Sequence, residues 1–110
     1  MVDQAPQWES TDQLGKTIHY AGTVGVVSAL IPAVAVGKIS SVLVRNPNRN
    51  ASAKKLDVAF DGGTTYLRLD PGEFAGWSPK NNASNTPITQ IRIIGVVAGV
   101  EYEIVVDYEP

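Results

Sequence analysis

Two adjacent glycines, Gly62 and Gly63, constrain the fold of this chain most, because alternating apolar and polar residues flank them on both sides. Alternation with a period of two is typical of a β-strand with one buried face. Glycine readily takes the positive φ angles of a two-residue hairpin turn. We therefore predict that residues 55–60 and 65–69 form an antiparallel hairpin. Its pairing would place three pairs on one apolar face: Leu56 with Leu69, Val58 with Leu67, and Phe60 with Thr65.

The rest of the chain shows the same short alternating segments and little helical periodicity. Further strands are predicted over residues 16–20, 22–31, 39–46, 74–78, 88–94 and 100–108. Asp70-Pro71-Gly72-Glu73 predicts a type II turn, with Gly72 at the position that requires a positive φ. Turn signals roughly every 8–12 residues are typical of β-sandwiches and barrels. We predict an all-β fold: a single antiparallel β-sandwich, jelly-roll or immunoglobulin-like, or a small barrel, with about seven to eight short strands.

Length and composition limit the function. The 110 residues suit one domain, with residues 1–15 as an N-terminal arm or irregular lead-in and residues 16–110 as the sandwich. The chain has no cysteine, which excludes disulfides and thiolate zinc sites. Nine basic and eleven acidic residues give no basic footprint for nucleic acid. A signal-peptide pattern is lacking, and the apolar residues 21–36 are too short and interrupted to span a bilayer, so we expect a soluble protein.

Catalytic and metal-binding patterns are weak. The single histidine, His19, lies in a predicted strand with no local nucleophile or orienting carboxylate, and the usual short catalytic motifs do not occur. Carboxylates recur at every second or fourth position near the C-terminus, at Glu101, Glu103, Asp107 and Glu109. Such a row could bind a hard cation, but a solvated outer strand face is the more common reason for it. We expect no enzymatic activity, no cofactor and no metal site.

One apolar segment does not fit a simple sandwich strand. Between residues 22 and 36 the apolar side chains occupy both alternating positions, so a strand here would be buried on both faces. A neighbouring subunit could cover the second face. We therefore predict assembly contacts through this segment and the N-terminal arm, at Trp8, Val24, Val26, Leu30 and Val34.

Three motifs together resemble small β-rich virion proteins of tailed bacteriophages, of the capsid decoration or cement type. They are a strand that ends in Asn46-Pro47, a strand that enters Phe60-Asp61-Gly62-Gly63-Thr64-Thr65, and a Pro71-Gly72-Glu73 turn that leads to Phe74. The resemblance implies a non-enzymatic structural protein, bound in many copies to the head lattice on the capsid surface of the virion. Its implied partners are the major capsid protein, copies of itself, or both.

Two alternative functions stay open. A tail- or baseplate-associated structural protein of the same virions would have a similar sequence. A carbohydrate- or receptor-binding β-sandwich would use exposed aromatic rings, and Tyr66, Trp77 and the asparagine-rich residues 79–87 are available for that role. We predict instead that Phe74 and Trp77 close the core.

Overall fold

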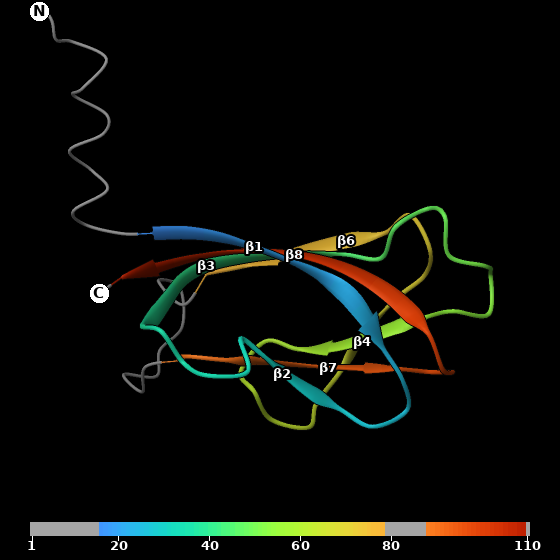
Figure 1. Cartoon of the computed structure of the whole chain (residues 1–110), viewed down its shortest axis with the longest axis horizontal. Helices are drawn as coiled ribbons and strands as arrows, with labels where there is room; N and C mark the ends of the chain where they lie inside the picture. Colours follow the sequence, from blue (N-terminus) through green and yellow to red (C-terminus); the bar gives the residue numbers. More distant parts are fainter. Residues whose placement is uncertain (1–15, 79–87, 110) are drawn as a thin grey trace, which may run out of the picture.

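The computed structural model describes residues 16–78 and 88–109, which fold into eight strands and contain no helix (Figure 1). The strands are β1 Lys16–Val24, β2 Ala29–Ile31, β3 Lys38–Arg45, β4 Leu56–Ala59, β5 Leu67–Leu69, β6 Phe74–Trp77, β7 Ile91–Gly95 and β8 Val100–Glu109. Within these residues no helix has the length and hydropathy needed to cross a membrane. The predicted N-terminal arm, including Trp8, and the asparagine-rich residues 79–87 lie outside the described residues.

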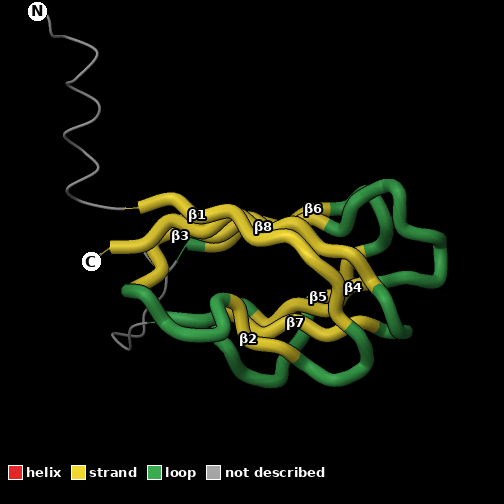
Figure 2. The backbone as a smooth tube through the Cα atoms, viewed as in Figure 1, coloured by secondary structure: helices red, strands yellow, loops and turns green. Residues whose placement is uncertain are grey.

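The strands form two antiparallel sheets, ordered β1-β8-β3-β6 and β2-β7-β4-β5, packed face to face (Figure 2). Four nested pairs, β1 with β8, β2 with β7, β3 with β6 and β4 with β5, make one long ribbon. Alternate pairs of the ribbon enter opposite sheets, which is the jelly-roll arrangement. The prediction of an all-β sandwich is confirmed, and the jelly-roll order is the one present.

The core lies between the sheets and is built from alternate residues of each strand. Strand β8 directs Ile104, Val106 and Tyr108 inward, while its carboxylates face outward, as the sequence predicts. In β3 a bulge shifts the register between Ile39 and Ser41, so that Ile39 and Val42 both face the core although three positions separate them. The sequence alternation therefore accounts for the core except where a bulge changes its phase.

The predicted hairpin is present, but its turn is longer than two residues. Leu56 pairs with Leu69 and Val58 with Leu67, as predicted. The strands then separate, and residues 60–66 form a loop in which Gly62 has a φ of 75°. The predicted pairing of Phe60 with Thr65 and the two-residue turn are therefore wrong. Leu67 is 49% exposed, whereas Leu69 of the same edge strand is 4% exposed, so the predicted place of Leu67 in the core is wrong as well.

The apolar residues 22–36 do not form one strand buried on both faces, and that prediction is wrong. Strand β1 ends at Val24, a loop follows, and the short strand β2 leads into a second loop. The apolar side chains occupy both alternating positions because much of this segment is loop, where the strand period does not apply. Val24 and Ile31 reach the core, whereas several valines of the two loops face solvent.

Candidate assembly surfaces

One side of the sandwich is formed by a segment with no formal charge. Strands β1 and β2 each form one edge of their sheets, and both lie on the near side of the view in Figure 1. From residue 17 to residue 37, between Lys16 and Lys38, the chain contains no Asp, Glu, Lys or Arg. Natural proteins commonly place charged residues on edge strands to prevent edge-to-edge pairing. The uncharged rim, as we call residues 17–37, lacks that protection.

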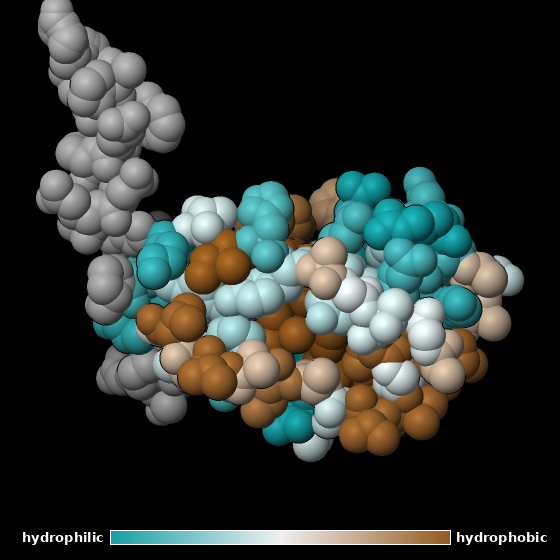
Figure 3. Space-filling model, in the orientation of Figure 1, coloured by the Kyte–Doolittle hydropathy of each residue, from teal (hydrophilic) through white to brown (hydrophobic). Residues whose placement is uncertain are grey.

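The uncharged rim also exposes large apolar side chains on the loops at both ends of β2. Figure 3 shows hydrophobic surface toward both ends of β2, with paler and hydrophilic surface between. The exposed fractions are 62% for Val26, 80% for Val27, 77% for Val34 and 50% for Val36. Exposed large apolar side chains that gather on one side of a protein commonly mark an interaction site.

The residues predicted to make assembly contacts differ in how exposed they are. Val26 and Val34 lie exposed on the uncharged rim, and Leu30 of β2 is half-buried between them in the chain. Val24 is 6% exposed and packs in the core of its own chain, so it offers little surface to a partner. Sequence reasoning missed Val27 and Val36, although the uncharged run from residue 17 to residue 37 could have indicated them.

An open groove lies on the other side of the sandwich, between the edge strands β5 and β6 and the loop at residues 60–66. The groove has a volume of about 750 Å³. Its lining residues are Val58, Phe60, Asp61, Thr65, Tyr66, Leu67, Gly76, Trp77 and Ser78. The rings of Phe60 and Trp77 stack with centroids 6.0 Å apart and planes 11° apart. The loop that replaces the predicted tight turn thus builds one wall of the groove.

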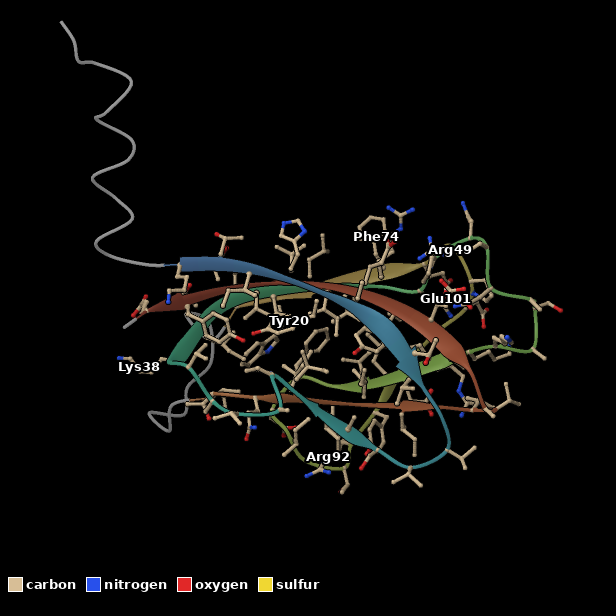
Figure 4. The ribbon with its side chains drawn as sticks, viewed as in Figure 1. Tyr20, Lys38, Arg49, Phe74, Arg92 and Glu101 are labelled. Atoms are coloured by element: carbon tan, nitrogen blue, oxygen red, sulfur yellow. The ribbon has the colours of Figure 1, made fainter. Side chains whose placement is uncertain are left out.

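The two aromatic residues of β6 face in opposite directions. Trp77 packs against the core, as predicted. Phe74 is 68% exposed, and its side chain points away from the core (Figure 4). In the register of β6 with β3, Phe74 is opposite Arg45. Its predicted role in closing the core is therefore wrong. The reason is geometric, because residues three apart in a regular strand lie on opposite faces. A strand without a bulge can therefore direct only one of the two residues, Phe74 or Trp77, into the core.

The acidic row faces outward from β8, as predicted, but cationic and hydroxyl groups contact most of it. Arg49 donates hydrogen bonds to Glu101 and Glu103, with the Arg49 Nη2 to Glu103 Oε2 distance at 3.2 Å. Arg49 and Glu101 lie close together in Figure 4. Arg45 Nε lies 3.5 Å from Glu103 Oε1. Glu101 and Glu103 of the row thus form ion pairs on the surface. Residues 16–78 and 88–109 contain no cluster of three or more His, Cys, Asp or Glu side chains that could hold a metal ion.

Asp107, in the same row, is held by hydroxyl groups. Ser41 Oγ and Thr17 Oγ1 each donate to its carboxylate at 2.6 Å. These hydrogen bonds lower the pKa of Asp107, the one from Ser41 having the larger effect, while partial burial opposes them. The carboxylate therefore joins β1, β8 and β3 across the outer face of the sheet.

His19 lies on the outer face of the first sheet and lines a hollow of about 400 Å³. Leu43 and Val105 line the hollow, and so does Glu103, which is paired with Arg45 and Arg49. The described lining residues thus present no nucleophile activated by His19. We assign no chemistry to this hollow.

Comparison with known proteins gives a likeness of fold. No protein-family model matches the chain, and no curated protein matches its sequence. Among solved structures, a protein of Bacillus endospore appendages, described as a novel family of disulfide-linked pili, is similar with a TM-score of 0.55. Its sequence identity is 15%, and the match covers 87% of each chain. FlhE matches with a TM-score of 0.47 and 14% identity over 87% of this chain and 98% of its own.

These findings define the class of protein as a small jelly-roll β-sandwich. At 15% identity the pilus protein supports the fold and nothing more specific. This chain has no cysteine, so the disulfide linkage of those pili is not available to it.

Proposed function

We propose that this protein is a non-enzymatic structural subunit that works in many copies within an ordered assembly. The observation that carries the proposal is the uncharged rim, with Val26, Val27, Val34 and Val36 exposed beside an edge strand. Burying a valine side chain contributes about 1.5 kcal/mol or more, so several such contacts per subunit favour association. Repetition over many copies adds avidity without any reactive group.

A similar fold in a protein that forms an assembly supports the proposal as a precedent. The similar Bacillus protein is described as forming pili, which are assemblies of repeated subunits. This fold can therefore serve as a building block, although the contacts must differ in a chain without cysteine.

We propose further that the assembly is a tailed-bacteriophage virion, where the protein decorates or cements the capsid. The support is the resemblance of the three sequence motifs, two of which contact each other in the fold. The N–H of Gly72 donates to the carbonyl of Asn46 at 2.7 Å, and the N–H of Asn46 donates to the carbonyl of Glu73 at 2.9 Å. These motifs thus have a structural role that joins β3 to the β5–β6 turn. They leave the uncharged rim free to contact the capsid lattice or another copy.

The test is to locate the protein on particles. Antibodies raised against the full chain would be applied to virions released by the strain that encodes it, followed by gold labelling and electron microscopy. Regular labelling of heads is expected. Labelling of tails or baseplates would replace capsid decoration with the tail-associated role, and particles without label would contradict the virion proposal.

A further inference from the structure

The jelly-roll order places the uncharged rim and the groove on opposite sides of the same subunit. Strands β1 and β2 stand first in their sheets, and strands β6 and β5 stand last. We propose that the uncharged rim of one copy docks into the β5–β6 groove of the next copy. The inference rests on the proposed function, because it specifies how the subunit would contact itself.

Within residues 16–78 and 88–109 no strand lies beyond β1 and β2 on one side or beyond β6 and β5 on the other, so this contact can continue both sheets. If β1 of one copy lies beside β6 of the next, the first sheet extends across the interface, and β2 beside β5 extends the second. The two contacting surfaces are different, so each copy keeps one free rim and one free groove after the contact forms. Such a heterologous contact generates a ring when its rotation closes and an open filament when it does not.

The chemistry of the two surfaces is complementary. Apolar side chains line much of the groove, and Leu67 is 49% exposed there. Among the described lining residues Asp61 is the only charged one, and it accepts a hydrogen bond from the N–H of Gly63 at 2.9 Å. An acidic segment entering the groove would lose its hydration and meet the like charge of Asp61, which is costly. The uncharged rim brings valine side chains and no formal charge, so it avoids that cost.

A saccharide is the competing occupant, because aromatic and polar groups both line the groove. Sugar binding on an aromatic platform needs an open ring face. Phe60 covers one face of the Trp77 ring, at a centroid distance of 6.0 Å. The apolar walls and the matching rim favour a second copy of this chain.

Two complementary variants test the contact. Val26→Asp with Val34→Asp blocks the uncharged rim, and Leu67→Asp blocks the groove. All three positions are well exposed, so we expect the fold to persist. Leu43→Asp is the matched control, because Leu43 is an exposed apolar residue, at 43%, on the outer face of β3 and outside both surfaces. Far-UV circular dichroism and thermal unfolding of each variant would verify folding.

Sedimentation velocity of the full chain gives the readout. The wild type and Leu43→Asp should associate as concentration rises, and each blocked variant should associate at least about tenfold more weakly. The decisive sample is an equimolar mixture of the two blocked variants. One intact rim then meets one intact groove, so the mixture should form a one-to-one dimer and no larger species.

The other outcomes separate this inference from the proposed function. If the wild type associates but the mixture stays monomeric, the rim–groove contact is wrong and the structural role stands. A wild type that is monomeric at every concentration contradicts the self-contact, whereas unlabelled particles contradict the virion proposal. In a Trp8→Phe background Trp77 is the only tryptophan. Quenching of its fluorescence by soluble oligosaccharides, lost in Leu67→Asp, would assign the groove to sugar and overturn the inference.

Discussion

The side-chain amide of Asn50 donates a 2.6 Å hydrogen bond to the side-chain carbonyl of Asn46, and both residues are buried. Asn46 Nδ2 donates in turn to the carbonyls of Lys54 and Leu69, at 3.0 and 2.9 Å. Asn50 also exchanges two hydrogen bonds with the backbone of Glu101. The pair therefore links the end of β3 to strands of both sheets, β8 and β5, with its polar atoms satisfied.

Asn46→Ala should destabilise the protein by about 2–4 kcal/mol, because it removes the hydrogen bonds that two backbone carbonyls accept, and one that the Asn50 amide donates, in a buried site. Urea unfolding followed by circular dichroism measures the change. Ser52→Ala, at an exposed position of the same loop, is the control and should change stability by less than about 0.5 kcal/mol. Equal stability of the two variants would contradict the linking role of Asn46.

Gly72→Ala should destabilise by about 1–3 kcal/mol, because Gly72 has a φ of 91°. A Cβ at this position would also require the side-chain oxygen of Asn48 to move. The turn at residues 70–73 matches the type II prediction, with the N–H of Glu73 donating to the carbonyl of Asp70 at 2.9 Å. Gly76→Ala is the matched comparison, since its added Cβ would meet neighbours at ordinary contact distances of 3.7 Å and more. Thermal unfolding should show a lower midpoint for Gly72→Ala alone.

Asp107 should make stability depend on pH in the acid range. Hydrogen bonds from Ser41 and Thr17 lower its pKa in the folded protein below the ordinary value of 3.8. A lowered folded pKa stabilises the fold fully above the unfolded value, and this contribution is lost as pH falls through the folded pKa. Asp107→Asn should therefore be less stable than the wild type near pH 7, and the difference should shrink below about pH 4. Urea unfolding of both proteins from pH 2 to pH 7 tests this, and a difference that is constant across the range would contradict it.

Alternation in the sequence predicted those parts of the fold that depend on local pairing. The register of Leu56 with Leu69 and Val58 with Leu67 followed from this alternation and from the position of the two glycines. The length of the connecting loop could not be predicted in this way, because the same register is compatible with a tight turn or with strands that separate early. The pairing of β1 with β8 joins opposite ends of the chain, and local propensity carries no information on such a contact.

The candidate site was predicted in part. The apolar residues 22–36 indicated a surface for assembly, and Val26 and Val34 are exposed there. Val24 could not be distinguished from them, because its burial depends on where β1 ends. The groove could not be predicted, since it requires the loop at residues 60–66 to lie beside β6.

Self-association through the uncharged rim should strengthen with sulfate. The rim carries no Asp, Glu, Lys or Arg between residues 17 and 37, so screening of ion pairs cannot weaken a contact made there. Sulfate is excluded from protein surfaces and strengthens the burial of apolar groups. Sedimentation equilibrium at rising ammonium sulfate should give tighter association of the wild type. Val27→Lys, at a position 80% exposed, should weaken association at every salt concentration while leaving unfolding within about 0.5 kcal/mol of wild type. Association that weakens as salt rises would point instead to the ion-paired surface around Arg49 and Glu101.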